Sequence, residues 1–148
     1  MSRFDVAAPV AKIGLRGLSA RDRGMFWEGF VATRPGIGYV RGNGFSRWRA
    51  VPGVGLNIAL YITNRSVGLF VRGQRGTPLS ATRIALRPDA ERLERALGAR
   101  LDDEAPLLRN LRLPTTDTTC WPIAYDWLRD NEADYLKALA ASGASSLD

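Results

Sequence analysis

The residues of this chain best suited to chemistry are arginines, and they lie in a stretch that contains no acid. Between Gly29 and Arg87 there is no aspartate or glutamate. The arginines of this stretch are Arg34, Arg41, Arg47, Arg49, Arg65, Arg72, Arg75, Arg83 and Arg87. Codon bias in a GC-rich genome explains why the cations are arginine rather than lysine, but it does not explain the missing acids. An uncompensated arginine field on one half of a small domain is typical of polyanion binding.

The other half of the chain compensates for this charge. Residues 1–87 carry fourteen Arg or Lys side chains against three acids, whereas residues 88–148 carry seven against twelve. This division also suits a protein-interaction module. There, the basic half of one copy would meet the acidic half of another copy, or an acidic partner protein.

Aromatic residues are interleaved with the arginines. In an extended segment, Arg47 and Arg49 fall on one side and Trp48 on the other. Two later strands bring Tyr61 and Phe70 to one face. A sheet face with aromatics and guanidinium groups can stack bases and bind phosphates, as single-strand binders do. If helices instead cover both faces of the sheet, Tyr61 and Phe70 are core residues.

The candidate nucleic-acid contacts come from this region. They are Arg41, Arg47, Trp48, Arg49, Arg65, Arg72 and Arg75. The loop 72–76 places two of these arginines among glycines, which suits a phosphate contact. A plain solvated turn would have the same composition.

Catalytic chemistry has few candidates. The chain has no histidine, which removes the usual general base and the imidazole metal ligand. We interpret Cys120 as a buried, inert thiol. Asp126 and Asp130, spaced i, i+4, are interpreted as a solvated helix surface. The glycines of residues 36–44 match no phosphate-binding fingerprint. We therefore predict no catalytic residue, metal or cofactor, and favour a non-enzymatic protein.

The clearest structural signal is a β-hairpin over residues 54–72. Its apolar residues alternate with small or polar ones, which is the period of a strand with one core face. The turn places Ile62 opposite Val67 and Leu60 opposite Leu69. A strand over residues 45–51 is expected before the hairpin. Another over residues 107–113 has Leu111 and Leu113 on one face and Arg112 on the other.

Three helical regions are expected. Ser19 and Asp22 predict a capped helix that ends at Arg34-Pro35-Gly36. Its apolar stripe consists of Met25, Phe26, Trp27 and Phe30. A second helix, from Pro88 to about Gly98, buries Leu93, Ala96 and Leu97. Asp117 caps a final helical region, which Asp130-Asn131 interrupts.

Together these elements predict an α+β fold in one domain over residues 1–148. An antiparallel sheet of three or four strands packs with the N-terminal helix and two C-terminal helical segments. Residues 1–17 form an extended lead-in, and residues 142–148 a frayed tail. The chain has a single cysteine, no signal-peptide pattern and no apolar run approaching about 18 residues. We therefore predict a cytoplasmic protein without a membrane partner.

Four motifs resemble those of a bacterial family, the domain-of-unknown-function family number 4268. They are Phe26-Trp27-x-x-Phe30, the hairpin Leu56–Val71 with Ser66-Val67-Gly68-Leu69, Leu93-x-x-Ala96-Leu97-Gly98, and Trp121-x-x-Ala124-Tyr125-x-Trp127-Leu128. The resemblance covers residues from about 19 to 140. Domains of that family often occur in proteins with a restriction-like nuclease domain, so the resemblance implies an accessory role near nucleic acid.

A nuclease active site of the restriction type is absent. That chemistry needs carboxylates that hold Mg²⁺ beside a lysine on adjacent strands. The predicted sheet core has no acid, and the only lysines are Lys12 and Lys137. We therefore expect a nucleic-acid-binding or nuclease-accessory domain, with the protein-interaction module as the alternative.

Overall fold

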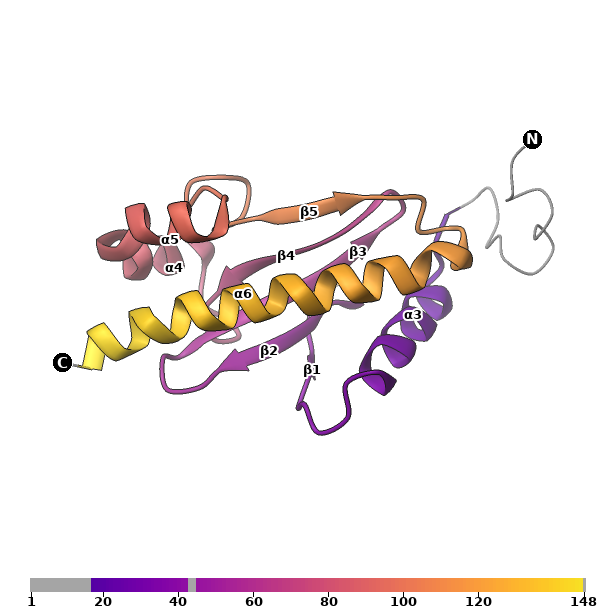
Figure 1. The fold of residues 1–148 in the computed structure, drawn as a ribbon, viewed down its shortest axis with the longest axis horizontal. Helices are drawn as coiled ribbons and strands as arrows, with labels where there is room; N and C mark the ends of the chain where they lie inside the picture. The colour runs from indigo at the N-terminus through magenta and orange to yellow at the C-terminus, as the bar shows by residue number, and fades with distance from the viewer. Residues whose placement is uncertain (1–16, 43–44, 148) are drawn as a thin grey trace.

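Five antiparallel strands form one sheet and follow one another across it in chain order (Figure 1). The computed structural model describes residues 17–42 and 45–147. The strands are β1 (Val40–Arg41), β2 (Arg47–Val51), β3 (Leu56–Thr63), β4 (Ser66–Arg72) and β5 (Arg109–Arg112). The predicted α+β fold is confirmed, with one more strand than expected because the two residues of β1 pair with β2. The predicted lead-in lies outside the described residues except for Gly17.

The hairpin of β3 and β4 has the predicted register. Leu60 lies opposite Leu69, and Ile62 lies opposite Val67. All four side chains are buried on the same side of the sheet. The alternation therefore selects both the pairing and the face that meets the core.

Helix α3 (Ala20–Ala32) begins with the predicted capping box. The backbone N–H of Asp22 donates to the Ser19 hydroxyl (3.1 Å), and the Asp22 carboxylate accepts from the N–H of Ser19 (2.9 Å). Phe26 and Phe30 are fully buried, but the prediction for Met25 is wrong, because this side chain is 46% exposed. At about 100° per residue, Trp27 and Phe30 lie on one side of Phe26 around the helix and Met25 lies on the other, so Met25 turns away from the core.

The segment between β4 and β5 contains a helix that the sequence analysis missed. It holds α4 (Leu79–Leu86), the 3₁₀ turn η2 (Arg87–Asp89) and α5 (Ala90–Leu97). Pro78 precedes α4 and makes no side-chain capping bond, so no start signal marks it. The prediction for Ala96 is also wrong. The i, i+4 pair Leu93 and Leu97 makes the core contact of α5, whereas Ala96 is exposed.

The final helix, α6 (Trp121–Leu147), is continuous. Asp117 caps the 3₁₀ turn η3 (Thr118–Cys120) that leads into it. The predicted interruption at Asp130-Asn131 is wrong, because the Asn131 side chain donates to the carbonyl of Trp127 (2.8 Å) and fits the helix. The helix also includes most of the predicted polar tail.

The two sides of the sheet differ. α6 crosses one side along the strands, and α3 lies beside it (Figure 1). The Phe26 ring of α3 lies 5.3 Å from Trp121 and 4.9 Å from Tyr125 of α6. These helices and the aliphatic side of the sheet enclose the core. Among the described residues, no helix crosses the other side of the sheet, so helices do not cover both faces.

Candidate nucleic-acid interface

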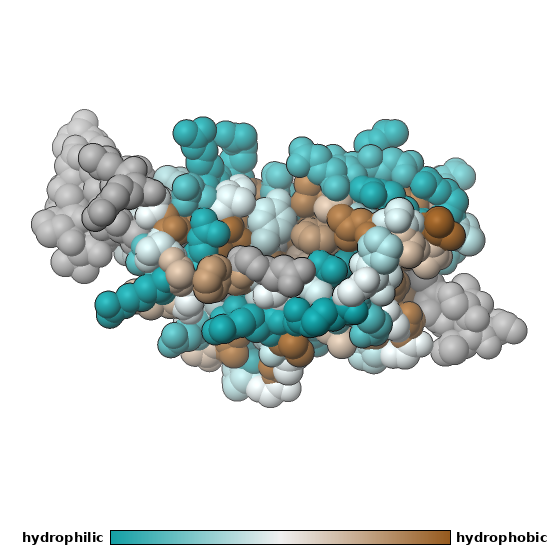
Figure 2. All heavy atoms as spheres, turned by 180° about the vertical axis from the view of Figure 1, so that it is seen from behind, coloured by the Kyte–Doolittle hydropathy of each residue, from teal (hydrophilic) through white to brown (hydrophobic). Residues whose placement is uncertain are grey.

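The register of the strands defines the residues on the sheet side away from α6, which we call the open face. They are Val40, Trp48, Ala50, Asn57, Ala59, Tyr61, Thr63, Ser66, Gly68, Phe70, Arg72, Asn110 and Arg112. Figure 2 shows the molecule from this side, with hydrophilic side chains around paler and more apolar ones. The predicted alternation, with Tyr61, Phe70 and Arg72 on the face opposite the aliphatic residues, is confirmed. Tyr61 and Phe70 are half-buried at this surface.

Two arginines stack on one tryptophan of the open face. The guanidinium carbon of Arg72 lies 4.0 Å from the centroid of the Trp48 ring, and that of Arg75 lies 4.8 Å from it. Gly42 also packs against this ring, and the ring N–H donates to the hydroxyl of Ser46 (3.2 Å), so that Trp48 is only 4% exposed. It thus supports the guanidinium groups and is not free to stack a base. Burial and the neighbouring charge of Arg75 lower the pKa of Arg72 from its ordinary value.

The loop after β4 is held in place by hydrogen bonds on both sides of Gly73. The Asn57 side chain donates to the carbonyl of Gly73 (3.2 Å), and the N–H of Gly73 donates to the hydroxyl of Thr82 on α4 (3.0 Å). Arg75 then donates to the carbonyl of Arg41 (2.6 Å). The missed helix α4 therefore helps to position the loop that carries Arg75.

Arg41 and Arg47 lie opposite each other on β1 and β2. Burial, followed by the charge of Arg41, lowers the pKa of Arg47. Arg47 points to the helix side of the sheet, where its guanidinium carbon lies 6.0 Å from the Trp27 ring centroid. The edge formed by β1 and β2 therefore carries two pairs of arginines, which together we call the arginine cluster. Arg41 and Arg47 are on the helix side, and Arg72 and Arg75 are on the open face. Among the described residues, no carboxylate lies within ion-pair distance of these four.

The other predicted arginines lie elsewhere. Arg49 forms an ion pair with Glu132 of α6, a fully buried carboxylate. Arg34 (3.4 Å) and the hydroxyl of Tyr39 (2.6 Å) donate to the same carboxylate. Arg65 is exposed in the β3–β4 turn, and its carbonyl accepts from the N–H that follows Arg112. The predicted site residues therefore do not form one patch.

The two remaining arginines of the acid-free stretch have partners in this chain. Arg83 donates to the carbonyls of Leu101 and Asp103. Arg87 makes two hydrogen bonds to the carboxylate of Asp102, at 2.8 and 2.9 Å. Pairing with Asp102 raises the pKa of Arg87 and lowers that of Asp102.

A depression of about 410 Å³ lies on the open face beside the arginine cluster. Its lining residues are Tyr61, Thr63, Ser66, Phe70, Glu104, Ala105, Leu108 and Asn110. The rings of Tyr61 and Phe70 lie 6.2 Å apart. The sequence analysis missed Asn110 and Glu104. The alternation in β5 was visible, but its pairing with β4 was not.

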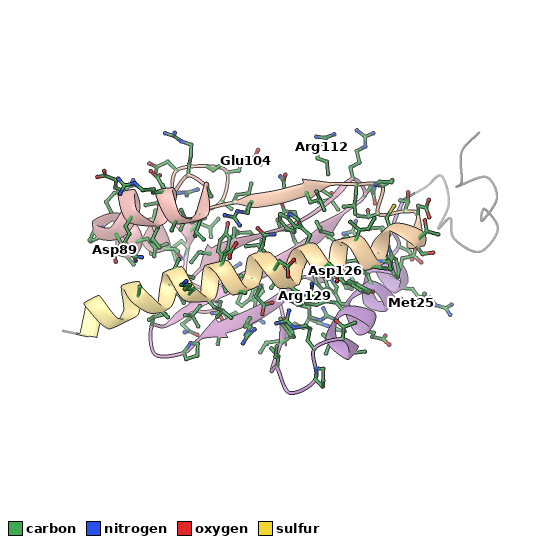
Figure 3. All side chains as sticks on the ribbon, viewed as in Figure 1. Met25, Asp89, Glu104, Arg112, Asp126 and Arg129 are labelled. Carbon is green, nitrogen blue, oxygen red and sulfur yellow. The ribbon has the colours of Figure 1, made fainter. Side chains whose placement is uncertain are left out.

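Cys120, Asp126 and Asp130 lie where the sequence analysis expected them, in the core and on an exposed helix surface respectively. Cys120 is buried. Asp126 and Asp130 are exposed on α6 and pair with Arg129 between them (Figure 3). Within residues 17–42 and 45–147, no group of His, Cys, Asp and Glu side chains is arranged to hold a metal ion. In the same residues, no helix has the length and apolar character needed to cross a bilayer.

The fold and surface define an α+β domain in which the described helices cover one side of the meander sheet. Comparison with family models, with curated proteins and with solved structures found no match to this chain. The family resemblance of the four motifs therefore stays a prediction.

Proposed function

We propose that this protein is a non-enzymatic domain that binds single-stranded nucleic acid on the open face of its sheet. The observation that carries the proposal is the position of half-exposed Tyr61 and Phe70 beside Arg72 and Arg75, which have no carboxylate partner among the described residues. Guanidinium groups bind phosphates, and aromatic rings on an open sheet stack bases that are free of a duplex.

The arginine cluster supports this function because contacts within the protein already fix the positions of two of its guanidinium groups. Arg72 and Arg75 lie on Trp48, and Arg75 is tied to the backbone of Arg41. Less side-chain freedom remains to be lost on binding, which favours affinity. Burial lowers the pKa of Arg72, and the charge of neighbouring Arg75 adds to this effect, so a bound anion relieves the repulsion between these two arginines.

The structure gives less support to assembly through complementary halves. Much of the acidity of α6 is matched within the chain, because Asp134 pairs with Arg109 and Glu132 with Arg49. The cytoplasmic location and the role beside a nuclease belong to this proposal as well. They follow from the single cysteine and the family resemblance of the sequence.

The test is fluorescence anisotropy with labelled single-stranded DNA, RNA and duplex DNA over a salt series. Two phosphate contacts, from Arg72 and Arg75, predict that log K falls with log[salt] at a slope of roughly −1.4 on single strands. We expect single strands to bind more tightly than duplex, since the aromatic residues need unstacked bases. Arg72→Ala and Arg75→Ala should each flatten the slope by about 0.7.

Arg129→Ala is the matched control, because it removes the same charge from α6 on the other side of the sheet (Figure 3). It should leave the slope unchanged. Equal effects of all three variants would mean that only net charge matters, and no binding at about 50 mM salt would refute the proposed function. A salt-sensitive oligomer without nucleic acid would favour the interaction module.

A further inference from the structure

The depression on the open face lies between charges of opposite sign, which are separated across the width of the sheet. Phe70 lies two residues before Arg72 on the same face of β4, so one end of the depression adjoins the arginine cluster. Glu104, in the loop that leads into β5, lies near the same end of β4, because the N–H of Val71 donates to the carbonyl of Pro106 (2.9 Å). It lies, however, on the β5 side of the depression, away from Trp48 of β2 (Figure 3). No described cation lies within ion-pair distance of this carboxylate. A phosphate is favoured on the side of Arg72 and Arg75 and repelled on the side of Glu104.

The floor of the depression is a tyrosine ring laid flat on the sheet. Gly68 lies opposite Tyr61 on β4, and a Cβ atom at Gly68 would come within 2.4 Å of the ring carbon that bears the hydroxyl. A hydrogen bond joins the Tyr61 side chain to Asn110 on β5. Burial raises the pKa of the Tyr61 hydroxyl, and the charges of Glu104 and Asp103 add to this effect. The ring is thus fixed and neutral, as a stacking platform requires.

The polar rim of the depression decides which base it suits. The carboxylate of Glu104 can only accept hydrogen bonds. Guanine presents two adjacent donors on its Watson–Crick edge, an imino N–H and an amino group. Cytosine and adenine present an amino donor beside an acceptor, and thymine and uracil place their single N–H between two carbonyls. A carboxylate therefore favours guanine and disfavours thymine and uracil.

We propose that the depression holds one base of a nucleotide, with a preference for guanine, while Arg72 and Arg75 hold the adjoining phosphates. This inference rests on the proposed function and adds a specificity to it. Tyr61 and Phe70 contact one face of the base, and Glu104 accepts from its edge. A guanine nucleotide within a strand and a free guanosine monophosphate share this chemistry.

The experiment uses labelled oligo-dT of about ten nucleotides in which one central position is G, A, C, T or abasic. We expect the guanine strand to bind roughly tenfold more tightly than the abasic strand, since stacking alone supplies this much. The thymine strand should bind least tightly of the four with a base. Unlabelled guanosine monophosphate as competitor distinguishes the two sources. Competition at micromolar concentration indicates a free nucleotide as the ligand, and its failure indicates a strand.

Glu104→Gln is the informative variant, because the side chain is exposed and the fold does not depend on it. It should abolish the guanine preference, because the guanine strand loses its acceptor and binds more weakly while the all-thymine strand, freed of the carboxylate, binds more tightly. Asp126→Asn on α6 removes the same charge elsewhere and should preserve the preference (Figure 3). Gly68→Ala, which displaces Tyr61, should lower binding of every strand with a central base to the abasic level.

The outcomes separate this inference from the proposed function. If strands bind but base and abasic versions bind equally, the base site is refuted and the nucleic-acid surface stands. A guanine preference that survives Glu104→Gln likewise overturns the role of Glu104. If no strand binds, the proposed function fails and the base site fails with it.

Discussion

The guanidinium of Arg72 on β4 lies over the ring of Trp48 on β2, although strand β3 runs between them. Ala59 is the residue of β3 that lies opposite both Trp48 and Phe70. Its methyl group is small enough for the longer side chains to meet above it. The contact joins one end of the hairpin to the edge of the sheet.

This contact should appear as an energetic coupling. We expect Arg72→Ala and Trp48→Leu to interact in a double-mutant cycle by about 0.5–1 kcal/mol in the free energy of unfolding, the size of a partly exposed cation–π contact. Urea unfolding measures it. A second cycle that pairs Trp48→Leu with Arg95→Ala on α5 serves as control and should show no coupling. A coupling near zero in the first cycle would contradict the stacked geometry.

Glu132 should be the most sensitive acid of the fold. Its carboxylate is fully buried and receives Arg49, Arg34 and Tyr39. Glu132→Gln leaves two guanidinium groups without their counter-charge, which costs about 3 kcal/mol. This lies at the low end for buried pairs, because the arginine side chains are 15% and 24% exposed. Asp130→Asn, in an exposed pair on the same helix, should cost less than about 1 kcal/mol. Equal losses would argue against the buried cluster.

The protein should lose stability in alkali. Burial raises the pKa of Tyr125 to about 12, and burial likewise raises the pKa of Tyr39 and Tyr135. The folded protein therefore holds these protons more tightly than the unfolded chain, in which tyrosine has a pKa near 10. The stabilisation that these tyrosines contribute is therefore fully present below about pH 10, and it is lost as the pH rises through their pKa values in the folded protein.

Each tyrosine contributes at most about 1.4 kcal/mol per pH unit, reduced where solvent reaches the ring. Urea unfolding from pH 9 to pH 11.5 tests this, with tyrosinate absorbance as a second readout. Tyr125→Phe should make the loss of stability less steep. Tyrosines that all titrate near pH 10 in the folded protein would show the prediction to be wrong.

Two glycines of α3 should respond oppositely to alanine. A Cβ at Gly24 meets nothing within 4 Å, whereas a Cβ at Gly29 would lie 2.4 Å from the hydroxyl oxygen of Tyr125. That hydroxyl donates to the carbonyl of Phe26, so it does not move away freely. Gly24→Ala should stabilise the protein by about 0.5–1 kcal/mol through helix propensity and chain entropy. Gly29→Ala should destabilise it by about 1–3 kcal/mol. Thermal melting distinguishes the two signs.

Local pattern determined much of the fold. The hairpin and its register follow from alternation, because a shift by one residue would expose every core side chain of β4. The start of α3 follows from Ser19 and Asp22, whose capping bonds involve only neighbours. Local signals were weak for α4, which begins without a side-chain cap. It depends instead on packing, including the contact of Thr82 with Gly73.

The charge pattern of the sequence determined that the acid-free region is basic, but only the tertiary structure decided which arginines remain available. Glu132 lies 83 residues from Arg49 in the chain, and no local pattern pairs them. The fold neutralises Arg49 and gathers Arg41, Arg47, Arg72 and Arg75 at one edge. The physical reason is that ion pairs and stacking depend on separation in space, which strand order and helix placement set, whereas alternation and capping act between residues close in sequence.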